Sequence, residues 1–173
     1  MRSLVFAAFV SLTIMPTIAA PAPAPELKKA IDAFTGSWTI EEDYPPNGKG
    51  HGTETWRPGP GNMSLIYDYA ADTPHGHVAA MAVLWWDARA KTFRELWCAG
   101  ASAAGCTLSP AIIRWDGNDL VFTETFMRGA KRVASREVWS GIKSDSHTMT
   151  ISEGQTASAL KPWLVTRATR TTR

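Results

Sequence analysis

The sequence predicts an all-β protein, a closed up-and-down meander barrel of about ten antiparallel strands with one short N-terminal helix. From residue 38 onward, apolar and polar residues alternate, as they do along strands with two different faces. Turn residues interrupt this alternation about every ten positions, which is typical of sandwiches and barrels. Strands joined by such short loops are neighbours in sequence order, and closing the meander removes the exposed edges of an open sheet.

The first residues have the features of a secretory signal peptide. A charged start is followed by an apolar run over residues 4–14 and then by small residues up to Ala19. Cleavage is expected after Ala19, because Pro21 disfavours cleavage one residue later, so residues 1–19 would be removed. The apolar run is shorter than the roughly 20 residues of a membrane-spanning helix. The sequence therefore predicts a secreted or periplasmic protein with no membrane span after signal removal.

The remaining chain is long enough for one domain and too short for two. Residues 20–25 alternate proline and alanine and are expected to form an extended spacer. A single domain is predicted over residues 26–170, followed by a tail at 171–173. The formal charge of the chain is only +2 and no basic stripe is present, so nucleic acid is not an expected partner. The sequence does not indicate an oligomeric state.

The predicted helix covers residues 26–34, because apolar residues recur three and four positions apart from Leu27 to Phe34. Gly36 ends it. The turns at 45–48 and 58–62 contain prolines, which lack the N–H group that a strand needs. The Gly-containing turns at 116–118 and 128–130 are typical of tight hairpins. Strands are predicted at 37–44, 52–57, 64–71, 77–86, 92–98, 106–115, 120–127, 132–142, 148–153 and 163–169.

The only two cysteines, Cys98 and Cys106, enclose a loop of small residues with two glycines. In an exported protein they are expected to form a disulfide that links two neighbouring strands. No Cys-x-x-Cys motif is present, which argues against a redox-catalytic or zinc site.

Three predicted strands place a carboxylate between apolar side chains on one face, and the sequence leaves open whether this face lies inside the barrel. If it does, the interior is apolar with a few polar groups, as in many small-molecule sites. A carboxylate held there is costly unless it is neutral or paired, with a ligand or with an arginine such as Arg57 or Arg114. The eight tryptophans either fill the core or line a site for an apolar ligand. The candidate ligand-binding residues are Trp97, Phe122, Glu124, Phe126, Glu137 and Trp139.

Four segments together resemble a bacterial family of calycin-like (lipocalin-type) β-barrels of unknown function. They are Gly36-Ser-Trp38, with the Leu27-Lys-Lys stretch before it, and the segments at 55–62, 84–97 and 114–121. The resemblance covers nearly the whole predicted domain, although each motif is loose. It implies a barrel that opens with Gly36 and Trp38. It also implies that an arginine near the end of the last strand packs on the Trp38 indole, with Arg167 expected there and Arg170 as the alternative.

Signatures of catalysis and of metal binding are weak. No nucleophile elbow, zinc-protease motif or phosphate loop is present, so no catalytic residue is assigned. His75 and His77 lie near Asp72, but no further ligand follows at a recognisable spacing, and no metal site is predicted. The histidine motif of related haem-binding barrels is not evident, and the cofactor is unknown. The acidic stretch 41–43 is expected to be a solvated strand end.

The sequence thus predicts an exported barrel that binds a small apolar or amphipathic molecule in its interior. Two alternatives remain open. The first is a barrel enzyme of isomerase or cyclase type that uses a buried carboxylate such as Glu124 or Glu137, whose pKa burial would raise. The second is a structural or interaction protein of the cell envelope. A carboxylate facing an open cavity would favour the enzyme, and a filled barrel would favour the envelope protein.

Overall fold

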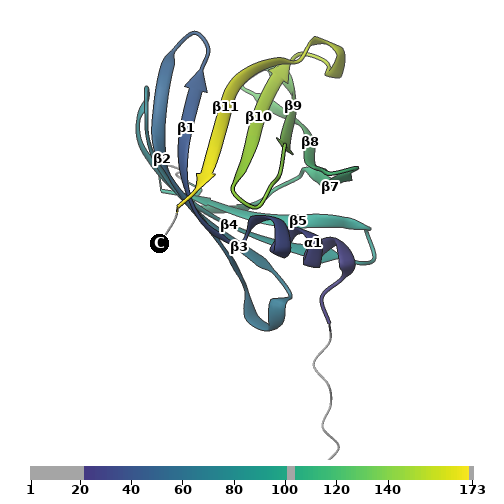
Figure 1. The fold of residues 1–173 in the computed structure, drawn as a ribbon. Helices are drawn as coiled ribbons and strands as arrows, with labels where there is room; N and C mark the ends of the chain where they lie inside the picture. The colour runs from purple at the N-terminus through teal and green to yellow at the C-terminus, as the bar shows by residue number, and fades with distance from the viewer. Residues whose placement is uncertain (1–21, 101–103, 172–173) are drawn as a thin grey trace, which may run out of the picture.

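The computed structural model describes residues 22–100 and 104–171, whose strands close into one antiparallel barrel (Figure 1). Strands that are neighbours in the sequence pair with each other, except β6 and β7, and β1 also pairs with β11. The predicted fold class is therefore confirmed, whereas the predicted signal peptide lies outside the described residues. The elements are α1 (Pro25–Phe34), β1 (Gly36–Tyr44), β2 (Gly48–Pro58), η1 (Pro60–Asn62), β3 (Leu65–Thr73), β4 (Gly76–Asp87), β5 (Thr92–Ala99), β6 (Cys106–Leu108), β7 (Ile112–Asp116), β8 (Asp119–Arg128), β9 (Lys131–Ser140), β10 (Ser146–Gly154), η2 (Ala157–Ala159) and β11 (Lys161–Arg170).

β6 and β7 together occupy one of the ten positions around the barrel, because both pair with β5. The sequence predicted a single strand over 106–115, and the structure interrupts it at residues 109–111. Pro110 lies in this interruption and has no N–H to donate to a ladder, which explains the break.

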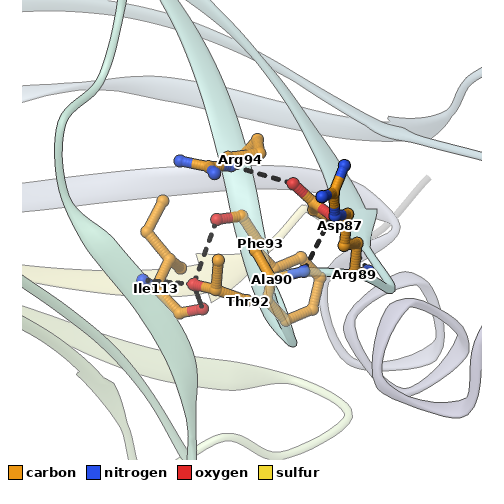
Figure 2. A network of polar contacts seen from close by, with 7 residues as sticks. All are labelled: Asp87, Arg89, Ala90, Thr92, Phe93, Arg94 and Ile113. Carbon is orange, nitrogen blue, oxygen red and sulfur yellow. Dashed lines mark hydrogen bonds and ion pairs between the residues drawn. The ribbon is translucent and has the colours of Figure 1, made fainter.

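A side chain reinforces the junction of β5 and β7, where Phe93 and Ile113 are the only residue pair in register (Figure 2). The buried Thr92 hydroxyl donates a hydrogen bond to the Ile113 carbonyl at 2.8 Å and accepts one from the Ile113 N–H at 3.1 Å. Thr92 therefore bonds both the N–H and the carbonyl of Ile113 at a junction that has only one residue pair in register.

The hairpin between β4 and β5 is held by Asp87, as Figure 2 also shows. Its Oδ1 accepts the backbone N–H groups of Arg89 and Ala90, and its Oδ2 accepts Nε of Arg94 at 3.2 Å. The bond from Ala90, followed by that from Arg94, lowers the pKa of Asp87. These contacts fix the turn that the sequence predicted between these strands.

Helix α1 closes one end of the barrel. Proline suits its first turn, where the backbone N–H has no helical partner. Leu27, Ala30 and Phe34 form its buried face, and the Phe34 ring stacks on Trp56 at a centroid distance of 5.0 Å. Burial of this apolar face holds α1 on the barrel. Among the described residues, no helix is long and apolar enough to cross a membrane.

The arginine over the Trp38 indole is Arg170, so the preference for Arg167 was wrong and the alternative is correct. The Arg170 guanidinium lies 4.0 Å from the ring centroid, and Trp38 donates its indole N–H to the Phe34 carbonyl at 2.9 Å. Trp38 and Arg170 are cross-strand partners and share the inner face, whereas Arg167, three residues earlier, points outward. A Cβ at Gly36 would overlap the Arg170 guanidinium, which explains the glycine at this position.

Cys98 and Cys106 form a disulfide, as predicted. They are direct partners in the register of β5 and β6. The bond joins these strands at the end of the barrel opposite α1.

Candidate functional site

The end of the barrel opposite α1 opens into a cavity of about 540 Å³. Exposed residues at its mouth come from three places, with His75 in the β3–β4 turn, Thr107 on β6 and Trp163 near the start of β11. Buried rings lie deeper. The lining consists of Glu42, Tyr44, Trp56, Tyr67, Tyr69, Thr73, His75, Val78, Glu95, Trp97, Thr107, Ser109, Pro110, Phe122, Glu124, Glu137, Trp139, Met149, Ile151, Trp163 and Leu164.

The aromatic and carboxylate face of β5, β8 and β9 lies inside the barrel, which resolves the orientation that the sequence left open. The cavity brings together five of the six candidate residues. Phe126 is the exception. It is half-buried, lies nearer the end of β8, and packs under the Arg128 guanidinium at 5.3 Å from the ring centroid. The five candidates that line the cavity are Trp97, Phe122, Glu124, Glu137 and Trp139.

Three carboxylates in the cavity have raised pKa values. Burial is the largest cause for each of them. It raises the pKa of Glu95 to about 7, an increase that the Ser109 hydroxyl opposes and Glu124 supports. It raises the pKa of Glu137 to about 8, with a further contribution from Glu95 and an opposing hydrogen bond from Trp139. The pKa of Glu124 is raised in the same direction, by burial and by Glu153.

Neither Arg57 nor Arg114 pairs with these carboxylates. Arg57 lies on the outer face, where its Nε is 3.6 Å from Asp68, and Arg114 is exposed on β7. The expectation that one of these two arginines could serve as the partner was therefore wrong. The lining residues of the described chain include no lysine or arginine.

Glu42 is buried, which corrects the prediction of a solvated acidic strand end. It is 2% exposed and accepts hydrogen bonds from Tyr44 at 2.7 Å, Tyr69 at 2.9 Å and Thr166 at 3.4 Å. The pKa values of Tyr44 and Tyr69 lie well above the ordinary tyrosine value, first because of burial and then because of the Glu42 carboxylate. The sequence does contain a signal for this, because Glu42 continues the alternating inward positions of Trp38 and Ile40.

A second buried polar group lies between the cavity and α1. His147 Nε2 is 2.7 Å from Oε1 of Glu54, and both side chains are almost fully buried. Trp56 and Tyr67 donate to the same carboxylate at 3.2 and 3.3 Å. Despite this close approach, the ring nitrogens of His147 make no hydrogen bond with the described residues. Sequence reasoning missed this pair because β2 and β10 are distant in the chain.

His75 and His77, which the sequence places near Asp72, separate in the structure. His77 and His51 flank Asp72 on the outer face, at 2.9 and 3.9 Å between nitrogen and oxygen, whereas His75 lines the mouth of the cavity. Within residues 22–100 and 104–171, no group of three or more histidine, cysteine or acidic residues is placed to hold a metal ion.

The adjacent tryptophans of β4 lie on opposite faces, as strand geometry requires. Trp86 packs on Phe93 at a centroid distance of 5.1 Å, and Trp85 lies on the other face, opposite Arg94. Neither residue lines the cavity.

Comparison with known proteins gives little further information. No protein-family model matches the chain, and no curated protein sequence matches it. One similar solved structure is a de novo designed, fluorescence-activating β-barrel. It is 10% identical, has a TM-score of 0.44, and the match covers 83% of this chain and 98% of that one. The resemblance to calycin-like barrels therefore stays a prediction.

Proposed function

We propose that this protein binds a small, apolar or amphipathic molecule in the open end of its barrel. The observation that carries this proposal is the cavity of about 540 Å³. Its volume falls within the range of about 300–1,000 Å³ typical of small-molecule sites. Aromatic rings form most of its deeper wall, and a few carboxylates supply polar groups. Rings bury much apolar area with little loss of side-chain freedom, which suits an amphipathic ligand.

Fluorescence quenching tests this proposal. An apolar dye in the cavity should quench the indole of Trp97, and fatty or aromatic competitors should displace the dye. Trp97→Phe should reduce the quenching, whereas Trp85→Phe, on the outer face of β4, should leave the ligand-dependent change intact. Saturable binding with this difference supports the proposal. Absence of binding, or an equal effect of both variants, contradicts it.

A barrel enzyme of isomerase or cyclase type is the second candidate. The observation that favours it is that Glu95 and Glu137 have pKa values of about 7 and 8 in a cavity open to solvent, which suits proton transfer near neutral pH. Mass spectrometry of the ligand recovered after binding separates the two functions. A ligand recovered unchanged supports a binding protein. A product that forms with the native chain but not with Glu137→Gln supports an enzyme.

A third role, as an envelope protein acting only through its surface, is less well supported, because the barrel is not filled. Export is part of the proposed function. The disulfide between Cys98 and Cys106 is consistent with a compartment outside the cytoplasm. The intact mass of the exported protein tests the signal peptide, and a chain that begins at Ala20 is expected.

A further inference from the structure

The charges that line the cavity are of one sign. Four glutamates contribute to its wall, and the lining residues of the described chain include no lysine or arginine. His75, at the exposed mouth, is the one lining side chain that could carry a positive charge. A ligand in this cavity therefore lies in a negative potential whenever the carboxylates are ionised.

The four glutamates differ in how fully they are hydrogen-bonded. Glu42 accepts from two tyrosines and a threonine, so the barrel itself already satisfies it. Glu137 accepts the Trp139 indole N–H on one oxygen, Oε1. Its other oxygen keeps its capacity to accept. Glu95, Glu124 and Glu137 line the same cavity from β5, β8 and β9, and the register pairs Glu137 with Phe122, two residues from Glu124, so we treat these three as one group. The charge of Glu124 raises the pKa of Glu95, and the charges of Glu95 and Glu124 raise the pKa of Glu137.

Aromatic rings adjoin this group of three carboxylates. The Tyr67 ring lies 6.4 Å from Trp97, 6.0 Å from Trp139 and 4.3 Å from Trp56, measured between ring centroids. Trp97 is two residues from Glu95 on the inner face of β5, and Trp139 is two residues from Glu137 on β9. Ring faces attract cations, so rings and carboxylates beside each other favour the same kind of ligand.

We infer that the ligand is an amphipathic organic cation, an amine or ammonium compound. Its charged nitrogen lies among Glu95, Glu124 and Glu137, and its apolar part lies against the rings of Tyr67, Trp97 and Trp139. This inference rests on the proposed function, because it names the class of ligand that the same cavity takes. The cation supplies the counter-charge that the barrel does not, which compensates for the cost of ionising carboxylates away from water.

Binding of a cation should also be linked to protons. Burial keeps Glu137 and Glu95 protonated to higher pH than usual, and a bound cation would stabilise their ionised forms. Cation affinity should therefore fall as the pH is lowered from about 9 to about 5, as these carboxyls become protonated. The titratable or charged groups that face this group or lie next to the cavity are Glu42, Tyr44, Tyr67, Tyr69, His75, Glu54, His147, Glu153 and Arg128.

Displacement of an apolar dye by three competitors that share one n-dodecyl chain tests the inference, with each competitor kept below its micellar concentration. They are dodecyltrimethylammonium, dodecanol and dodecyl sulfate. The cation should displace the dye at a concentration about tenfold lower than the neutral alcohol, and the anion should be the weakest. If the alcohol or the sulfate binds as well as the cation, the inference is wrong, although the proposed function survives. If the dye does not bind, both are wrong.

Variants test whether the preference for the cation over the alcohol arises from the carboxylates in the cavity. Glu95→Gln/Glu124→Gln/Glu137→Gln should bring the affinity for the cation down to that for the alcohol without weakening the binding of the alcohol. Glu41→Gln, which removes an exposed charge from the outer face of β1, should keep the preference. His75→Gln should keep both the preference and its pH dependence. An unchanged preference in the triple variant would overturn the inference, and the comparison of competitors on the native chain stands even if that variant fails to fold.

Discussion

Side chains two residues apart on a strand share a face, and this alternation separates the roles of similar charged residues in this barrel. Arg170 faces inward, where it covers the Trp38 indole and donates to the backbone carbonyls of Thr35 and Ser144. Arg167 faces outward and is exposed. Arg170 therefore connects the first strand, the last strand and the end of α1, and Arg167 does not.

Arg170→Ala should lower the free energy of unfolding by about 1–3 kcal/mol, because it removes a cation–π contact and hydrogen bonds to two carbonyls. Arg167→Ala is the matched control on the same strand and should change it by less than about 0.5 kcal/mol. Urea unfolding, followed by tryptophan fluorescence, measures both variants. If Arg170→Ala and Arg167→Ala lower the free energy of unfolding equally, the contact between Arg170 and Trp38 does not stabilise the barrel.

Glu137 should make the stability of the barrel depend on pH. Its pKa is raised from 4.5 to about 8, first of all by burial, so the folded chain holds this proton more tightly than the unfolded chain does. The stabilisation from the proton is fully present below about pH 4.5 and is lost as the pH rises towards about 8. Glu137→Gln stays neutral at every pH. Its free energy of unfolding should therefore rise by on the order of 2 kcal/mol relative to that of the native chain as the pH increases across this range.

Unfolding by urea at a series of pH values measures this difference, with Glu41→Gln as the exposed control. A difference between Glu137→Gln and the native chain that does not change with pH would contradict the raised pKa.

At the scale of single residues, the sequence predicted less of the site than of the fold. Alternation placed Trp97, Glu124 and Trp139 on faces of mixed aromatic and acidic character, but the pattern is the same whether such a face points inward or outward. The pair of Glu54 and His147 could not be predicted, because β2 and β10 meet only through the closure of the whole barrel.

At the scale of elements, the junction between β5 and β7 differs from the other strand pairings in the length of its ladder. The other neighbouring strands are joined by ladders of several residues, whereas this junction has one residue pair in register. Pro110 accounts for the interruption between β6 and β7. The sequence predicted the hairpins correctly, because the turn glycines Gly117 and Gly129 do adopt positive φ. It did not predict the break, since the alternation continues on both sides.

Thr92→Val should lower the free energy of unfolding by about 1–3 kcal/mol, because the replacement keeps the shape of the side chain and removes the two hydrogen bonds between the hydroxyl and the backbone of Ile113. Thr125→Val, at an exposed position of β8, is the control and should have little effect. Thermal or urea unfolding measures the change. If both variants are equally stable, the hydroxyl does not support the junction.

At the scale of the whole molecule, the two ends of the barrel differ in how they are filled. α1 and the rings around Phe34 close one end, and the other end keeps its cavity. A barrel of about this size can be filled by side chains or can hold a ligand. The sequence predicted the barrel and its many tryptophans, but not how much space they leave. That space depends on the directions of side chains from every strand at once.

Blocking the cavity tests the central claim of a ligand-binding barrel most directly. Val78 lines the cavity on β4, and its neighbour Ala79 is exposed on the outer face. A titration with an apolar dye should therefore give one site per chain, with affinity reduced about tenfold or more by Val78→Trp and unchanged by Ala79→Trp. Equal binding by the two variants, or no saturable binding by the native chain, would contradict the claim.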